Sequence, residues 1–319
     1  MDFTSLTVDT APAPWTGRND GDGPAHRRWW QAVATPATAV SDSSADSPGP
    51  AALLGFCSDE GVRRNKGRLG AAAAPAAIRA ALGSLAFHGA RPVTDVGDVV
   101  VAGGSLEDGQ ARAGRVLTAM LDAGQLTFVL GGGHETAFAS YLGVAGTAAV
   151  ANGARLGVLN LDAHFDLRDA SVPSSGTPFL QMAHAETAAG RKLNYAVVGI
   201  SEPNNTRLLF DTAHDLDVKY LLDEDCSAER TAAFVSAFLE TVDIVYLTID
   251  LDVLPAAVAP GVSAPAAYGV PLPVIAAVCR QVAASGKLFH FDVAELNPEF
   301  DVDNRTAKVA ARLVDTLLR

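Results

Sequence analysis

The sequence predicts an α/β protein with a mostly parallel sheet, and three observations support this class. Apolar runs of strand length recur from residue 51 onward. Helix-length segments rich in alanine and leucine lie between most of these runs. Aspartate and histidine side chains follow three of the runs, and ligands of parallel sheets bind beyond the carboxyl ends of the strands. Because parallel strands are usually buried, we expect helices on both faces of the sheet.

The first fifty residues differ from the rest of the chain. Residues 1–50 show little periodicity, and the stretch from Thr35 to Pro50 is rich in Ala, Ser, Asp and Pro, which predicts a loop or linker. Trp15, Trp29 and Trp30 are unusual for a disordered tail, because such tails are poor in aromatic residues. We therefore expect an arm that packs on the domain surface or on a neighbouring subunit, with plain disorder as the alternative.

Eight apolar runs predict strands, and six segments between or after them predict helices. The strands start near Ala52, Val93, Leu126, Leu156, Tyr195, Val218, Ile244 and Leu288. The expected helices are Ala71–Leu82, Gly109–Ala123, Glu135–Val150, Ser227–Thr241, Pro271–Ala284 and Asn304–Leu318. These counts fit an open sheet and do not exclude a closed (β/α)8 barrel.

Composition narrows the classes of function. The formal net charge of -12 argues against nucleic acid as a partner, because phosphate binding favours a basic surface. An anionic small molecule stays possible, since a pocket can be locally basic. The three cysteines, Cys57, Cys226 and Cys279, are far apart and predict reduced thiols rather than a disulfide framework. We see neither a secretory signal nor an apolar stretch long enough to span a membrane, and we expect no membrane partner.

The stretch NLDAHFDLR, from Asn160 to Arg168, directly follows an apolar run. Asp162, His164 and Asp166 alternate along it, and alternate residues of an extended chain point to the same side. Ionised carboxylates are costly to bury without a partner. Two carboxylates and an imidazole at the end of a buried strand therefore predict a bound cation.

Two further strand ends carry side chains of the same kind. Asp250 and Asp252 lie in TIDLDVL, and His134 follows Gly131–Gly133, which we expect to form a tight turn. Alone, the aspartate pair would also suit a helix cap, and His134 a packed side chain. Taken together, two histidines and four aspartates suit two metal ions that share a carboxylate. This ligand set suits Mn²⁺ and would also bind Zn²⁺, Fe²⁺ or Co²⁺.

At these residues the chain resembles the ureohydrolase family, which includes arginase and agmatinase. GGGH, DAHFD and IDLDVL match the three metal motifs of the family in order, and DVAELNP matches a fourth. The segments GFCSDEGVRRNKGRLGA, SSGTPF and WTGRND are similar to those of family members that hydrolyse N-formimino-L-glutamate. The resemblance implies an open three-layer α/β/α fold of the arginase type, with about eight mostly parallel strands. It also implies one catalytic domain over residues 51–319, after an arm and linker at 1–50.

The resemblance further implies two Mn²⁺ ions per subunit. In that scheme, His134 and Asp166 hold one metal, Asp162 and Asp250 bridge, and His164 and Asp252 complete the second site. A hydroxide that bridges the metals attacks the formimino carbon and releases L-glutamate and formamide, a step of histidine degradation in the cytoplasm. The alternatives are another ureohydrolase, acting on agmatine, guanidinobutyrate or arginine, and a metal-free paralogue, which the presence of all six ligands disfavours. We also expect a homo-oligomer.

Glu295 matches the substrate-facing glutamate of the family, and the resemblance implies that it pairs with the positively charged imino nitrogen. The alternative for Glu295 is a buried ion pair with an arginine. Arginases carry a histidine proton shuttle in the loop after DAHxD, whereas SSGTPF contains none. His184 lies further on in an expected helix, so Asp166 or water is expected to supply the proton to the leaving amine.

N-formimino-L-glutamate carries two carboxylates, so its site needs local positive charge. Arg168 lies two residues beyond Asp166 and should point to the same side, where its guanidinium can bind a carboxylate with two hydrogen bonds. The alternative for Arg168 is an ion pair with a core aspartate. Further candidates for substrate contacts are Arg64, Asn65, Ser175, Thr177, Asn204 and Asn205.

Overall fold

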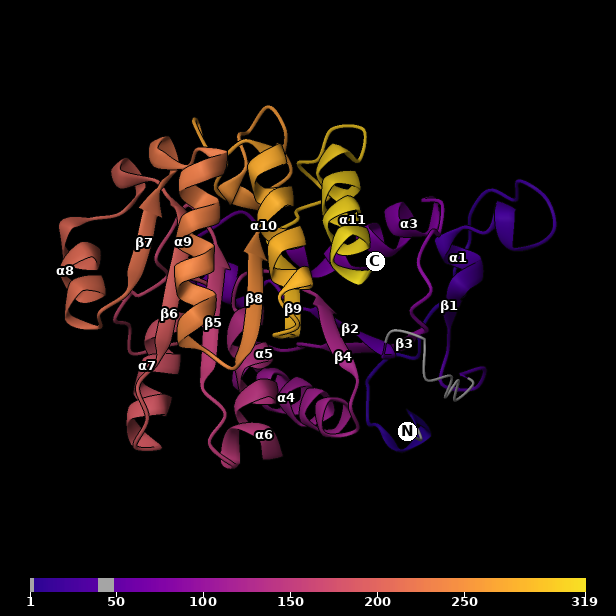
Figure 1. Cartoon of the computed structure of the whole chain (residues 1–319), viewed down its shortest axis with the longest axis horizontal. Coiled ribbons are helices and arrows are strands. Elements are labelled where there is room, and N and C mark those ends of the chain that lie inside the picture. The colour runs from indigo at the N-terminus through magenta and orange to yellow at the C-terminus, as the bar shows by residue number, and fades with distance from the viewer. Residues whose placement is uncertain (1–2, 40–48) are drawn as a thin grey trace.

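Nine parallel strands form one open sheet in the part of the chain that the computed structural model describes, residues 3–39 and 49–319 (Figure 1). Their order across the sheet is β1-β3-β2-β4-β9-β8-β5-β6-β7. Every neighbouring pair is parallel, so the carboxyl ends of all the strands lie along one edge. The strands are β1 (Val33–Ala34), β2 (Ala51–Cys57), β3 (Val93–Val100), β4 (Leu126–Leu130), β5 (Leu156–Leu161), β6 (Asn194–Ile200), β7 (Lys219–Leu222), β8 (Ile244–Asp250) and β9 (Leu288–Ala294).

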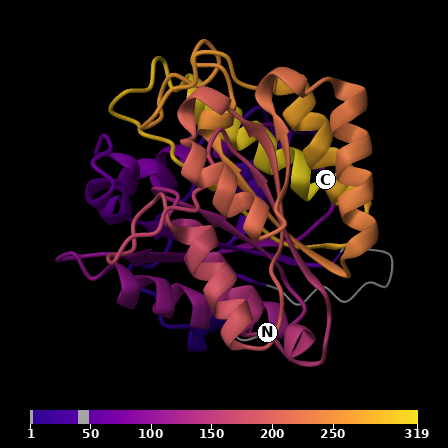
Figure 2. The ribbon, with the colours of Figure 1, turned by 90° about the vertical axis from the view of Figure 1, so that its left-hand side faces the viewer.

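Helices cover the sheet on two sides, as Figure 2 shows. One side is packed by α3 (Ala74–Gly83), α9 (Ala228–Thr241), α10 (Leu272–Ala284) and α11 (Arg305–Leu318). The other side is packed by α4 (Leu106–Asp122), α5 (Thr136–Ala145), α7 (Pro178–Ala188) and α8 (Arg207–Asp215). Three shorter helices complete the set: α1 (Trp29–Ala32), α2 (Glu60–Arg64) and α6 (Ala148–Ala151).

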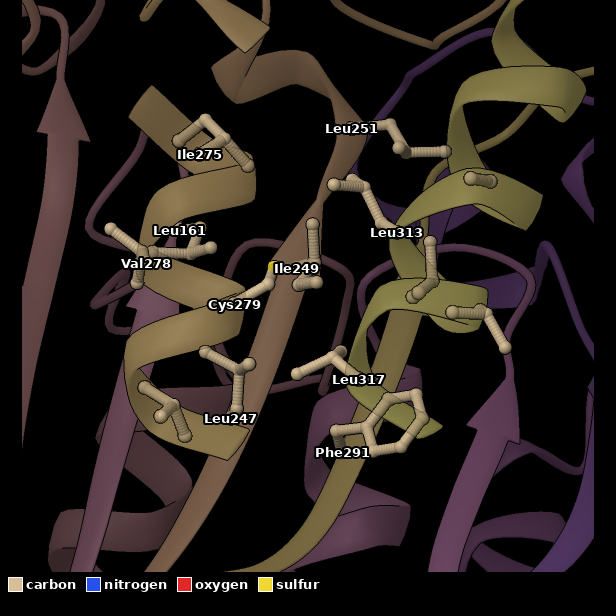
Figure 3. Close-up of a cluster of buried hydrophobic side chains, with 14 of the residues drawn as sticks. Leu161, Leu247, Ile249, Leu251, Ile275, Val278, Cys279, Phe291, Leu313 and Leu317 are labelled. Atoms are coloured by element: carbon tan, nitrogen blue, oxygen red, sulfur yellow. The ribbon is translucent and has the colours of Figure 1, made fainter. Parts of the chain in front are cut away.

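Strand periodicity explains the two separate cores. Successive strand residues point to opposite faces of a sheet, so Leu247 and Ile249 of β8 pack beneath α10 and α11 (Figure 3). Tyr246, which directly precedes Leu247, joins the core on the other side. Because both faces are covered, the central strands read as continuous apolar runs.

The N-terminal segment folds back onto the domain. Val33–Ala34 pair with β3 as the edge strand β1, and Thr10 forms an isolated bridge to Asp98 of the same strand. Trp29 is buried and donates a hydrogen bond to Asp315 of α11 at 2.9 Å. Residues 3–39 therefore contact the strands and helices that follow, and part of the expected linker, residues 40–48, lies outside the described residues.

All eight expected strands are present, and the two-residue β1 is an addition. The barrel alternative is wrong, because β1 and β7 are free edges of an open sheet. The helix expected over Glu135–Val150 is two helices, since the chain breaks at Gly146 and restarts at the cap Thr147, whose hydroxyl accepts from Val150 N. Within the described ranges, no helix is long and apolar enough to cross a membrane, and all three cysteines are free.

Candidate active site

Four adjacent central strands, β4, β9, β8 and β5, deliver the predicted ligands to one edge of the sheet. His134 follows β4, Glu295 follows β9, Asp250 ends β8 and Asp162 follows β5. Because these strands are parallel neighbours, their ends converge although they come from distant parts of the sequence. The structure thus brings together the three metal motifs and the DVAELNP stretch.

The first ligand group forms around His134. Its Nδ1 lies 3.1 Å from Asp162 Oδ2, 3.0 Å from Asp166 Oδ2 and 3.2 Å from Asp250 Oδ2. His134, Asp162 and Asp250 are fully or almost fully buried. Three carboxylates thus converge on one imidazole nitrogen.

The second group forms around His164 and shares Asp162 with the first. His164 Nδ1 lies 3.0 Å from Asp252 Oδ2 and 3.5 Å from Asp162 Oδ1. In each of two sets, His134–Asp162–Asp250 and Asp162–His164–Asp252, the ligand atoms lie within 4.8 Å of one another. Each set is compact enough for one metal ion, and Asp162 offers one oxygen to each.

The electrostatics of the cluster favour added positive charge. Burial and the neighbouring charges of Asp252 and Asp162 raise the pKa of Asp250 well above its ordinary value. Burial opposes protonation of His134, but its hydrogen bonds with aspartates, Asp162 and Asp166 among them, raise its pKa well above the ordinary value. Divalent cations among these groups would relieve the repulsion between the carboxylates. The residues present therefore fit a metal centre.

A hydrogen-bond chain behind His134 fixes its tautomer. Thr248 Oγ1 donates to Asp292 Oδ1 at 2.6 Å and lies 3.0 Å from His134 Nε2. Since a hydroxyl has one proton, Thr248 accepts from Nε2–H of His134. Nδ1, whose proton the aspartates hold here, is then the nitrogen left to bind a metal ion once that proton is displaced. Asp292, which also accepts from the Tyr246 hydroxyl at 2.6 Å, anchors this chain.

The three glycines before His134 provide space. A Cβ at Gly132 would lie 1.7 Å from Ser58 O, and one at Gly133 would lie 2.2 Å from Glu135 Oε2. The chain bends at Gly132 and Gly133 directly after β4, and none of Gly131–Gly133 has a positive φ, so the glycines serve this bend by leaving space and not by a left-handed backbone. They let the loop pack against the end of β2, which sets the position of His134.

A second brace holds the loop that carries His164. The Asn205 side chain accepts from Phe165 N at 3.1 Å and donates to Ala163 O at 2.9 Å. Asn205 is buried. It therefore contacts the backbone on both sides of His164 and lies outside the substrate pocket described next.

A pocket of about 330 Å³ opens over the ligand cluster. Its acidic lining residues are Asp166, Asp250, Asp252 and Glu295, beside both histidines. Its lining also includes three basic residues, Lys66, Arg68 and Arg168, together with Asn65, Ser175 and Ser263. One cavity thus carries both the acidic ligand cluster and several positive side chains.

Three of the predicted substrate residues line this pocket. Arg168 Nη1 donates to Asn65 Oδ1 at 2.7 Å, and Asn65 Nδ2 lies 3.1 Å from Ser175 Oγ. Arg168 has no ion pair with a carboxylate among the described residues, which removes the alternative of a core aspartate partner. These three side chains form one connected polar wall.

The other predicted contacts lie elsewhere. Arg64 forms ion pairs with Glu60 at 2.8 Å and Glu107 at 2.6 Å, and it does not line the pocket. Thr177 is buried, where its hydroxyl bonds within its own turn and to Gln181. Asn204 and His184 are exposed outside the pocket. The structure therefore does not bring these side chains to the site.

Sequence reasoning missed Lys66 and Arg68, which follow Asn65 in the same loop. The run GVRRNKGR contains four basic residues, and nothing in its spacing tells which of them face a cavity. The structure separates them: Arg63 and Arg64 pair with Glu60, whereas Lys66 and Arg68 line the pocket. A search for acidic residues within one helical turn finds Glu60. It would have excluded Arg63 and Arg64 from the candidates for the pocket lining.

Glu295 is almost fully buried among the acidic residues of the pocket. Its Oε1 accepts from the backbone N–H of His134 at 2.7 Å, and its own N–H donates to Gly132 O at 2.8 Å. Burial and the charge of Glu135 raise the pKa of Glu295 to about 8. Within the described part of the chain no arginine pairs with it, so the ion-pair alternative does not hold.

Comparison with known proteins agrees with this geometry. The model of the arginase family matches residues 50–319. The formimidoylglutamase of Rhodococcus jostii is 58% identical over 310 residues, which cover 96% of this chain and 95% of that protein. The formimidoylglutamase of Chromobacterium violaceum is 48% identical over 309 residues, which cover 96% and 97% of the two chains.

Solved structures share the fold at lower identity. A Bacillus subtilis formimidoylglutamase has a TM-score of 0.75 at 21% identity, covering 90% of this chain and 89% of that one. A Trypanosoma cruzi formiminoglutamase with Mn²⁺ has a TM-score of 0.75 at 24% identity, covering 87% and 95%. These likenesses establish the arrangement of helices and strands.

Proposed function

This chain belongs to the arginase family, and we propose that it hydrolyses N-formimino-L-glutamate to L-glutamate and formamide. The observation that carries the reaction class is the pair of ligand groups joined by Asp162 beneath a pocket that is lined by both acidic and basic residues. The choice of substrate is supported by the formimidoylglutamases that are similar over nearly the whole chain. The reaction would serve histidine degradation in the cytoplasm.

The ligand cluster would hold two Mn²⁺ ions. Four ionised aspartates carry four negative charges, which two divalent ions balance. His134 and Asp166 would bind one ion, His164 and Asp252 the other, with Asp162 and Asp250 between them. When bound, such ions polarise the substrate and lower the pKa of a water molecule at the site.

Glu295 would orient the amidine. Its Oε1 is held by the His134 N–H, and the positively charged imino nitrogen would favour the ionised form of this carboxyl, whose Oε2 then accepts a hydrogen bond from that nitrogen. Addition of water to the formimino carbon and cleavage of its bond to the amino nitrogen give formamide and the free amine. Asp166, which lines the pocket beside His134, would take a proton from the added water and give it to that leaving nitrogen.

The polar wall would hold the substrate's tail. Arg168 presents a charged fork to the pocket and has no carboxylate partner of its own in the described chain, so it can bind a substrate carboxylate. Asn65 and Ser175 stand beside it and would complete that contact. Arg64, Thr177, Asn204 and Asn205 are not retained in this role, because they do not line the pocket.

A substrate panel tests the proposal. The purified protein is loaded with Mn²⁺ and given N-formimino-L-glutamate, agmatine, guanidinobutyrate and arginine, with L-glutamate and urea as the measured products. We expect release of L-glutamate and its loss on chelation. Urea release from a guanidine in preference to this reaction would overturn the substrate assignment, and full activity without metal would overturn the metal centre.

A further inference from the structure

We propose that Lys66, supported by Arg68, binds the second carboxylate of the substrate, the one at the end of its side chain, and so selects for a diacid. This inference rests on the proposed function and adds a contact that the sequence motifs do not indicate. Lys66 and Arg68 line the same pocket as the metal ligands, from the loop that follows α2.

The first argument is that no carboxylate of the described chain balances the positive charges of Lys66 and Arg68. Arg63 and Arg64 of the preceding helix are both paired with Glu60, at 2.6 and 2.8 Å. Lys66 and Arg68 form no ion pair with any described residue, although the protein is acidic overall. Cations that face a pocket without a protein carboxylate are free to bind a carboxylate of a ligand.

The second argument is backbone conformation. Six described non-glycine residues have a positive φ, and three of them, Lys66 (63°), Asp166 (47°) and Glu295 (69°), line this one pocket. The others are aspartates and an asparagine, which tolerate this region, whereas lysine is rarely found there. Strain of this kind persists where the surroundings impose it, often at ligand sites. The strained backbone at Lys66 therefore fixes the direction in which its side chain leaves the loop.

Arg68 supports Lys66 as a second positive charge that is held in a fixed position in the pocket. Its guanidinium donates to the carbonyl oxygens of Ser263, at 3.0 Å, and Val262, and it stacks 4.0 Å above the ring of Phe300. These partners are uncharged, so the positive charge of Arg68 is kept but its position is fixed. Gly67 packs so closely that a Cβ would lie 2.5 Å from Ser263 Oγ. Lys66 is exposed between these fixed neighbours, and its amine has no partner in the described chain.

The chain path favours a different cation for each carboxylate. Arg168 is two residues from the proposed ligand Asp166, so their Cα atoms are at most about 7 Å apart. The substrate carboxylate beside the formimino nitrogen must also lie near the metal ligands, and it falls to Arg168. The distal carboxylate reaches further, toward Lys66, which follows Asn65, the hydrogen-bond partner of Arg168.

Three variants test this assignment. Lys66→Asn removes the charge but tolerates the positive φ, because asparagine is enriched in that region. Lys66→Arg keeps the charge and serves as the conservative rescue. Arg63→Gln removes a charge from the preceding helix α2, outside the pocket, so it reports any general change in the electric field.

Two substrates separate the carboxylates. N-formimino-L-glutamine has the same shape as N-formimino-L-glutamate, but its distal group is a neutral amide. For Lys66→Asn we expect kcat/KM to fall about ten-fold or more on the glutamate substrate, as for loss of one hydrogen bond to a charged group, and to change less than about two-fold on the glutamine substrate. Lys66→Arg should recover most of the loss, and Arg63→Gln should match wild type on both.

Calorimetric binding of the product keeps this inference separate from the proposed function. Lys66→Asn should weaken binding of L-glutamate to the Mn²⁺-loaded protein and leave L-glutamine unchanged. Equal losses on both ligands, no loss on either, or an equal loss in Arg63→Gln would overturn the role of Lys66. If wild type fails to hydrolyse N-formimino-L-glutamate while the selective loss of glutamate binding persists, the proposed function falls and the carboxylate contact stands.

Discussion

At the scale of single residues, the site depends most on Asp162. It contacts His134 through Oδ2 and His164 through Oδ1, so it belongs to both ligand groups. Asn160 Nδ2 donates to Asp162 Oδ2 at 2.9 Å and to the Tyr195 hydroxyl at 3.0 Å, which holds the carboxylate from behind. The orientation of Asp162 is therefore set before any ligand arrives.

Replacing the shared carboxylate should empty both metal sites. In Asp162→Asn a neutral amide cannot bridge two cations, so we expect bound manganese to fall from about two ions per chain to less than one. Mass spectrometry of the dialysed protein measures this content. Asp169→Asn, an exposed aspartate three residues beyond the ligand Asp166, is the control. Retention of both ions in Asp162→Asn would mean that the two groups do not share it.

At the scale of elements, the position of the loop that carries His134 depends on its contacts with the ends of neighbouring strands. The loop between β4 and α5 lies against the end of β2, with Gly133 N donating to Ser58 O at 2.9 Å. It also contacts the end of β9 through Glu295. His134 is thus positioned by three strands that are contiguous in the sheet.

A single methyl group in this loop should disturb the metal centre. Gly132→Ala would place a Cβ 1.7 Å from Ser58 O, a backbone atom that cannot rotate away. We expect a stability loss of about 1–3 kcal/mol, as for overpacking, and weaker metal binding, measured by denaturant unfolding and metal titration. Gly49→Ala, where a Cβ meets nothing within 4 Å, is the control. Equal metal affinity in the two variants would contradict the role of this close contact.

Strand β9 also contains a histidine that should make stability depend on pH. His290 is fully buried, and burial lowers its pKa from 6.5 to about 3. Between these values the unfolded chain binds a proton that the folded chain does not, so stability falls as pH falls below 6.5. From pH 7.5 to 5.5, wild type should lose about 1.4 kcal/mol more than His290→Asn in denaturant unfolding. Parallel losses in the two proteins would show that His290 does not titrate in this way.

At the scale of the whole molecule, the first residues close one edge of the sheet. β1 covers β3, and Trp29 packs against Phe87 with ring centroids 5.0 Å apart. Trp15 donates to Asp95, which also pairs with Arg79 of α3. The arm thus contributes to the stability of the domain that follows it.

Removing one side chain of the arm should therefore destabilise the protein. Trp29→Ala deletes a buried indole and leaves Asp315 without this donor, so we expect a loss of about 3–5 kcal/mol in the free energy of unfolding. Trp30→Ala should cost clearly less, because Trp30 is partly exposed and bonds within the arm to Arg18 O. Similar losses for the two tryptophans would argue against the anchoring role of Trp29.

The sequence was informative at the apolar runs and the residues that directly follow them. Asp162, His164 and Asp166 could be singled out because ligand-type side chains follow an apolar run, but the expected alternation along an extended chain is wrong, since β5 ends at Leu161, the chain bends at Ala163 and His164, and Asp166 has a positive φ of 47°. All eight longer strands followed from apolar runs. The placement of Lys66 and Arg68 in the pocket could not be predicted, because it depends on Ser263, about 195 residues further along the chain. β1 escaped prediction because two residues carry no periodic pattern.

The acidic residues of the pocket and two of its basic residues come from different segments of the chain, and this affects how the protein can evolve. Most metal ligands lie at the ends of the central strands, whereas Lys66 and Arg68 lie on a loop after α2. Substitutions in that loop can alter which molecules are accepted while leaving the reacting centre intact. The residues that carry out the reaction and the residues that select the substrate can therefore change separately. A descendant protein could accept another substrate while it keeps the same proposed metal ligands.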